Sequence, residues 1–101
     1  MKIFLDDVRD YPKGWIKTRF PSVVIYLLEN KNVTELSLDH DLGNDDYNGT
    51  GYDVLLWIEE KVFTDINFIP PKINIHTSNY GVRKKMEQAV KKINSLYKSK
   101  G

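Results

Sequence analysis

The carboxylates and histidines of this chain include three short clusters, and each cluster follows a short segment of mainly apolar residues. The clusters are Asp6-Asp7, Asp39-His40-Asp41 and His76-Thr77-Ser78-Asn79. Carboxylate oxygens are the ligands that hard divalent cations such as Mg²⁺ prefer, and a histidine beside a carboxylate is suited to proton transfer. If the three clusters meet in the folded chain, they can hold a metal ion and transfer protons at one site.

The aspartates of the first two clusters are candidate metal ligands. We expect Asp6, Asp7 and Asp39 to bind a divalent ion, with Mg²⁺ favoured, because one or two carboxylates and several waters satisfy that ion. The alternative for the first pair is a solvated turn, since Asp is common where strands end. A later acidic pair, Asp45-Asp46, is interpreted as part of a solvated loop.

The two histidines of the sequence, His40 and His76, both follow predicted strands. Carboxylates flank His40 and favour a charged imidazole, which can act as a general acid or bind phosphate. The alternatives are a surface histidine in an acidic loop for His40 and a packed histidine for His76. Their common position favours a shared role in catalysis. The candidate catalytic residues are therefore His40, His76, Asp39 and Asp41, with Asp41 orienting His40.

The periodicity of apolar residues predicts the elements that position these clusters. Strands are predicted at residues 2–5, 15–19, 33–38 and 72–76, and helices at 21–28, 52–64 and 82–96. Strands that alternate with helices indicate parallel pairing through right-handed crossovers. We therefore expect an α/β fold, a small three-layer sandwich around a mostly parallel four-stranded sheet. Ligands of such sheets bind outside the carboxyl edge, where all three polar clusters arrive.

The composition indicates one domain that spans residues 1–101. A chain of 101 residues with 41% hydrophobic residues can bury one modest core, and the absence of cysteine excludes thiolate metal sites and disulfides. The sequence shows no signal-peptide pattern and no apolar run near the roughly 20 residues that span a bilayer. We expect a cytoplasmic protein without a membrane partner, and no feature indicates an obligate protein partner.

Residues near the starts of the predicted helices are candidates for phosphate binding. At least one of the three polar residues before the last helix is expected to cap it, and a helix N-terminus favours an anion. The lysines and arginines of the last helix are interpreted as its solvated face, although Arg83, Lys84 and Lys85 could contact an RNA backbone. The candidate substrate-binding residues are Thr77, Ser78, Asn79, Arg83, Gly51 and Arg9.

The arrangement of these residues resembles the receiver domains of response regulators, with acidic residues after the first strand, Asp39 after the third, Gly51 before a helix and Thr77 after the fourth. Four motifs more specifically resemble the cyclic-phosphate-processing receiver-like family, which is bacterial and phage-associated. These motifs are Phe4-Leu5-Asp6-Asp7-Val8-Arg9, Leu36-Ser37-Leu38-Asp39-His40-Asp41-Leu42-Gly43, Thr50-Gly51-Tyr52-Asp53 and His76-Thr77-Ser78-Asn79. The resemblance implies a reduced receiver, or flavodoxin-like, fold and a role in acting on cyclic phosphate ends of RNA or nucleotides.

Several features differ from a signalling receiver. The segment between the first two predicted strands is too short and proline-broken for the receiver's first helix, and no fifth strand is expected. His40-Asp41 adds a proton-transfer group beside the position of the phosphoacceptor, and His76 has no counterpart in the receiver pattern. These departures favour hydrolysis over phosphosignalling.

We therefore expect a phosphoesterase-type hydrolase that acts on a cyclic phosphate, either an RNA 2′,3′-cyclic phosphate end or a cyclic nucleotide. A divalent metal ion would assist, and His40 and His76 would share the general base and general acid roles. A metal-free reaction could use the same residues. Two alternatives are a binding module, with Tyr52, Trp15 or Tyr80 stacking on a base, and a phosphoacceptor switch that uses Asp39. The expected partner is a nucleotide or an RNA end that carries a phosphate.

Overall fold

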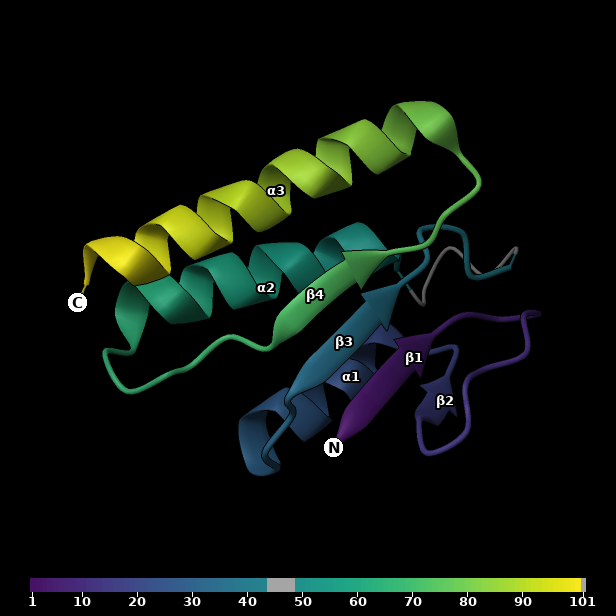
Figure 1. Ribbon diagram of the computed structural model, residues 1–101, viewed down its shortest axis with the longest axis horizontal. Coiled ribbons are helices and arrows are strands. Elements are labelled where there is room, and N and C mark those ends of the chain that lie inside the picture. The colour runs from purple at the N-terminus through teal and green to yellow at the C-terminus, as the bar shows by residue number, and fades with distance from the viewer. Residues whose placement is uncertain (44–48, 101) are drawn as a thin grey trace.

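The computed structural model describes residues 1–43 and 49–100. Within these residues the chain forms four strands and three helices in the predicted order, and the ends differ from the prediction by no more than three residues (Figure 1). The elements are β1 (Lys2–Leu5), β2 (Ile16–Thr18), α1 (Pro21–Asn30), β3 (Glu35–Leu38), α2 (Gly51–Thr64), β4 (Lys72–Ile75) and α3 (Tyr80–Ser99).

The strands form one parallel sheet in the order β2-β1-β3-β4. This order is that of a flavodoxin-like fold without its fifth strand. Neighbouring strands end in the same register, because Leu5 pairs with Leu38 and Leu38 pairs with Ile75. The prediction of a reduced receiver fold of the α/β class is confirmed, and in the described sheet all the pairings are parallel.

The layering is simpler than the expected three-layer sandwich, because the three helices cover one face of the sheet. Helix α2 packs between α1 and α3. The crossovers from β2 to β3 and from β3 to β4 run in the same direction across the sheet, and crossovers of one hand then leave their helices on the same face. In the described part of the chain, no helix lies between β1 and β2 and none covers the second face. The domain therefore has two layers.

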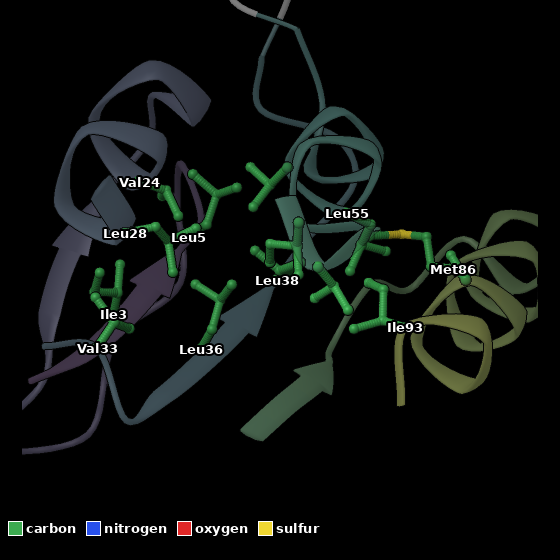
Figure 2. Close-up of a cluster of buried hydrophobic side chains, with 14 of the residues drawn as sticks. Ile3, Leu5, Val24, Leu28, Val33, Leu36, Leu38, Leu55, Met86 and Ile93 are labelled. Atoms are coloured by element: carbon green, nitrogen blue, oxygen red, sulfur yellow. The ribbon is translucent and has the colours of Figure 1, made fainter. Parts of the chain in front are cut away.

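Alternate residues of the strands form the core with the helices. Ile3, Leu5, Leu36 and Leu38 are fully buried. Figure 2 shows the labelled core side chains between the sheet and the helices, with Leu55 of α2 beside Met86 and Ile93 of α3. Each such buried aliphatic side chain contributes about 1.5–3 kcal/mol relative to an exposed one. The helices are therefore fixed to the sheet by a continuous apolar layer.

The other strand residues point to the face without helices, which we call the open face. Its rows across β1, β3 and β4 are Lys2, Glu35 and Lys72, followed by Phe4, Ser37 and Asn74. Strands buried on both faces read as continuous apolar runs, whereas β3 and β4 alternate between polar and apolar residues. The open face is therefore largely polar, and it leads toward the carboxyl edge of the sheet.

Side-chain caps fix the starts of the two helices that border this edge. The Thr50 N–H donates to Asp53 Oδ2 at 2.8 Å and the Tyr52 N–H donates to Thr50 Oγ1, which forms a capping box at α2. Asn79 Oδ1 accepts from the Val82 N–H at the start of α3. None of the helices in the described residues is long and apolar enough to cross a membrane.

Candidate functional site

Asp6, Asp39 and His76 lie side by side, each one residue beyond the end of its strand. The backbone ladder continues through them, because the Asp39 N–H donates to Leu5 O at 3.0 Å and the His76 N–H donates to Leu38 O at 2.9 Å. The three side chains offer ligand atoms that all lie within 4.8 Å of one another. Since side chains alternate along a strand, all three stand at the corner between the carboxyl edge and the open face.

Asp6 is fully buried, and protein groups contact both of its carboxylate oxygens. Its Oδ1 accepts from the N–H groups of Val8 at 2.9 Å and Arg9 at 3.0 Å, and its Oδ2 lies 2.9 Å from His76 Nε2. Burial alone would raise the pKa of Asp6, but the hydrogen bonds from Arg9, Val8 and His76 outweigh it, so the pKa lies below its ordinary value of 3.8. Asp6 is therefore ionised at neutral pH.

His76 contacts polar side chains through both of its ring nitrogens. Nδ1 lies 2.7 Å from Ser37 Oγ, and the ring stacks on Phe4 with centroids 4.3 Å apart. Burial lowers the pKa of His76 below its ordinary value of 6.5, and the hydrogen bond and charge of Asp6 oppose this effect only in part. The neutral ring fits these contacts if Nε2–H donates to Asp6 and Nδ1 accepts from Ser37. Proton transfer by His76 would require one of these contacts to open.

Asp39 is 9% exposed and presents one free carboxylate oxygen to the site. Its Oδ1 accepts from the N–H of His40 at 2.8 Å, and no group in residues 1–43 or 49–100 donates to its other oxygen. Gly51 allows the start of α2 to lie close to the backbone of Asp39. A Cβ on Gly51 would lie 1.9 Å from the Asp39 carbonyl oxygen, so only glycine fits here. The Gly51 N–H donates to His40 O, and the close approach to Asp39 accounts for a glycine at this position.

An open cleft of about 490 Å³ is lined by Asp39 and by Asp7, the neighbour of Asp6 in the chain. Asp39 and Arg9 both line it, and Arg9 Nε lies 3.7 Å from Asp6 Oδ2. Two residues expected to bind substrate, Arg9 and Ser78, are therefore at the cleft. The residues that line it are Asp7, Val8, Arg9, Asp39, Asp41, Gly43 and Ser78.

His40 and Asp41 form a pair at the edge of the cleft. His40 Nδ1 lies 2.8 Å from Asp41 Oδ1, which is the contact expected of a carboxylate that orients a histidine. His40 is partly exposed and Asp41 is well exposed, so the pair is accessible to solvent. A hydrogen bond at Nδ1 leaves Nε2 as the nitrogen available for chemistry.

The remaining expected site residues have other contacts. Thr77 is buried and accepts from the Asn79 N–H, and Asn79 caps α3, as expected for at least one of these residues. Arg83 pairs with Glu87 at 3.6 Å and lines a separate groove between β4 and α3. Neither Thr77 nor Arg83 lines the cleft described above. The pair Asp45-Asp46 lies outside the described residues.

The donor set of the three-residue row fits a divalent cation. Two ionised carboxylates would neutralise such an ion, and a neutral imidazole could complete the protein ligands. Asp7 lies in the cleft beside the row but is not one of the three clustered ligands. Sequence reasoning did not identify His76 as a ligand or Ser37 as its partner. The signal for Ser37 is its position, in the row directly below Asp39 on the same face of the sheet.

The parallel sheet, its strand order and the acidic carboxyl edge define this chain as a receiver-like domain. Residues 1–92 match the family model of the cyclic-phosphate processing receiver domain, and the chain belongs to that family. A search of curated proteins and a search of solved structures each found no match.

Proposed function

We propose that this domain is a phosphoesterase-type hydrolase that opens a cyclic phosphate with the help of a divalent metal ion. The observation that carries the proposal is the row of Asp6, Asp39 and His76 at the edge of a cleft that also borders the His40–Asp41 pair. Membership of a family associated with cyclic-phosphate processing supports the choice of substrate. Three candidate metal ligands and a histidine–carboxylate pair therefore lie in one small region.

Asp6 and Asp39 would hold the metal ion together with His76. The ion would supply charge neutralisation of the non-bridging phosphate oxygens. Asp6 is suited to this role because its backbone hydrogen bonds fix the carboxylate and keep it ionised. Asp39 is suited because one oxygen is anchored by the His40 N–H while the other, among the described groups, has no donor.

His40 would act as the general base. Asp41 holds Nδ1, so Nε2 would accept a proton from the water that attacks phosphorus. Attack forms one P–O bond and breaks the ester bond of the ring, and the released oxygen takes a proton from water in the open cleft. The product is a phosphomonoester with a free hydroxyl group. His76 would serve the metal ion rather than the proton transfer, because it belongs to the three-residue cluster and Ser37 Oγ can hold Nδ1 in either neutral tautomer.

Arg9 and Ser78 would contact the phosphate oxygens. Both residues line the cleft, and a guanidinium can donate two hydrogen bonds to one phosphate. Arg9 lies beside Asp6 without a short hydrogen bond to it, since the distance from Nε to Oδ2 is 3.7 Å. Its side chain is about half exposed and can therefore turn toward a ligand in the cleft.

The open face supports an RNA end as the substrate. Trp15 packs edge-to-face against Phe4, with ring centroids 6.2 Å apart, and Phe4 in turn stacks on His76. Lys2 lies 5.9 Å from the centre of the Trp15 ring, and Lys17 points to the same side as Phe4 by register. Aromatic rings interspersed with lysines are suited to bases and phosphates of single-stranded RNA. The nucleotide that carries the cyclic phosphate would occupy the cleft.

A phosphoacceptor switch is the second candidate, because Asp39 directly follows β3 and one of its oxygens accepts no hydrogen bond from the described residues. A substrate panel separates the two functions. Incubation with 2′,3′-cyclic and 3′,5′-cyclic nucleotides should yield phosphomonoesters with divalent metal and none with a chelator. The His40→Ala variant should lose this turnover. Labelling of Asp39 by acetyl phosphate, with every cyclic nucleotide recovered intact, would instead support the switch.

A further inference from the structure

We infer that the metal centre selects an ion that accepts imidazole, such as Mn²⁺ or Co²⁺, over Mg²⁺, with His76 Nε2 as a ligand and Ser37 as the residue that positions it. The inference rests on the metal site of the proposed function, and it adds the class of the ion and a residue outside the cleft. Four observations support it: the fixed ring of His76, the hydroxyl of Ser37, the free oxygen of Asp39 and the charge of the ligand set.

The His76 ring is held on three sides. Phe4 stacks on its face at 4.3 Å with an interplanar angle of 9°, and Ser37 Oγ lies 2.7 Å from Nδ1. These contacts leave Nε2 directed at the carboxylate of Asp6, 2.9 Å away. A nitrogen fixed in this way next to two carboxylates is placed as a ligand before any ion arrives, so little side-chain ordering accompanies binding.

The Ser37 hydroxyl can accommodate either form of the neutral ring. A hydroxyl group both donates and accepts, so it can donate to Nδ1 when Nε2 carries the proton. When Nε2 must present its lone pair to a cation, the proton resides on Nδ1, and Ser37 Oγ accepts a hydrogen bond from Nδ1–H. The ring exchanges one tautomer for the other, and its net charge does not change. Partners of this kind commonly orient histidine ligands and set their tautomer.

Asp39 gives an independent indication that a ligand belongs here. The residue is only 9% exposed, and in the described part of the chain one of its carboxylate oxygens receives no hydrogen bond. A carboxylate oxygen of Asp39 lies within 4.8 Å of the candidate ligand atoms of Asp6 and His76. A buried carboxylate with a free oxygen is costly unless a cation or a donor satisfies it.

The composition of the ligand set decides the class of ion. Two carboxylates and a neutral imidazole carry two negative charges, which match a divalent cation. Mg²⁺ prefers oxygen ligands in near-ideal octahedral geometry, whereas first-row transition ions accept imidazole nitrogen readily. A receiver-like site that uses carboxylates alone would suit Mg²⁺, so the nitrogen ligand moves the preference of this site toward Mn²⁺ or Co²⁺.

Metal binding to the full chain tests the inference without any substrate. Mn²⁺ titrated into metal-free protein should bind at least about tenfold more tightly than Mg²⁺. The spin-echo signal of bound Mn²⁺ should show coupling to ¹⁴N, and growth on ¹⁵N-labelled histidine should replace that coupling with one to ¹⁵N. The labelled wild-type protein keeps the experiment informative even if a His76 variant folds poorly.

Variants identify the ligand and its partner. His76→Gln should lose the nitrogen coupling, whereas the matched His40→Gln variant should keep it. Ser37→Ala should weaken Mn²⁺ binding by about tenfold or more while the coupling persists, and Ser37→Thr should restore the affinity. Equal affinity for Mg²⁺, the absence of nitrogen coupling or its persistence in His76→Gln would each overturn the inference. Nitrogen-ligated Mn²⁺ without turnover would contradict the proposed hydrolysis alone.

Discussion

The imidazole Nε2 of His76 lies 2.9 Å from Oδ2 of Asp6, although 70 positions separate the two residues in the chain. The contact joins the ends of β1 and β4 across β3, while Ser37 contacts Nδ1 of the same ring and Phe4 stacks on its face. A ligand site built in this way depends on the register of three strands. Its integrity can therefore be measured through folding as well as through activity.

The metal-free domain should become less stable as the pH falls from 7 toward 5. The pKa of His76 lies below 6.5 in the folded state, so the unfolded chain binds the proton more readily, and the free energy of unfolding rises with pH. The stability is fully present above pH 6.5 and is lost as the pH falls through the folded-state pKa. The lowered pKa of Asp6 adds a second loss below about pH 3.8. Urea unfolding at a series of pH values, with chelator present, measures both losses of stability.

The loss of stability between pH 7 and 5 should arise from protonation of His76. The His76→Gln variant should show a flat free energy of unfolding between pH 7 and 5, while His40→Gln should keep the decrease. A wild-type domain that gains stability as the pH falls over this range would contradict the lowered pKa of His76.

Replacement of Gly51 by Ala should destabilise the fold by about 2 kcal/mol or more, as expected when extra atoms enter a packed site. The added Cβ would lie 1.9 Å from the carbonyl oxygen of Asp39, and backbone cannot move aside as a flexible side chain can. Gly81→Ala is the matched control. Its Cβ would have no neighbour closer than 4.0 Å, and Ala in helix α3 should add about 0.5 kcal/mol of stability. Similar losses for both variants would argue against the close approach at Gly51.

Arg9 and Arg83 should differ in their effect on turnover of a cyclic nucleotide. Arg9 lines the cleft, whereas Arg83 pairs with Glu87 beside another groove. Loss of a charged hydrogen bond to phosphate costs about 1.5–3 kcal/mol, so Arg9→Ala should lower kcat/KM by roughly tenfold to a hundredfold. Arg83→Ala should stay within about twofold of the wild type. A larger effect at Arg83 would place the phosphate at α3 instead.

Salt should affect an RNA substrate more strongly than a mononucleotide. A single-stranded RNA that lies along the open face would contact Lys2 and Lys17, and each phosphate neutralised releases counterions. The logarithm of kcat/KM for a short RNA with a 2′,3′-cyclic end should therefore fall steeply with the logarithm of salt concentration. Lys17→Gln should reduce that slope by about 0.7, and Lys84→Gln, on α3, should leave it unchanged. Equal salt dependences of kcat/KM for RNA and mononucleotide would show that RNA does not bind along the open face.

Much of the fold follows from the periodicity of the sequence. The helical stripe of α3 and the short apolar segments of β1, β3 and β4 are strong local signals, which is why the order of the elements is predicted correctly. To predict that helices cover only one face of the sheet, the residue pattern within each strand must also be considered. Sequences such as Lys72-Ile73-Asn74-Ile75 alternate between polar and apolar residues, and this alternation indicates one uncovered face even in a parallel sheet.

The candidate site is only partly visible in the sequence. Asp6, Asp39 and His76 each follow a strand, so their meeting at one edge is predictable from topology. The atoms that come into contact depend on the strand register, and no local signal indicates that Ser37 Oγ contacts Nδ1 of His76. Arg83 illustrates the opposite case, because its closeness in sequence to Asn79 does not place its side chain at the cleft.

The central claim is that this domain hydrolyses a cyclic phosphate, and ³¹P NMR of the reaction in ¹⁸O-labelled water tests it most directly. With a divalent ion present, a 2′,3′-cyclic nucleotide or RNA end should become a phosphomonoester that carries one ¹⁸O atom on phosphorus. Asp39→Asn and His40→Ala should abolish this product, and Arg83→Ala should form it at the wild-type rate. Recovery of the cyclic phosphate unchanged, whether free or bound to the domain, would contradict the claim.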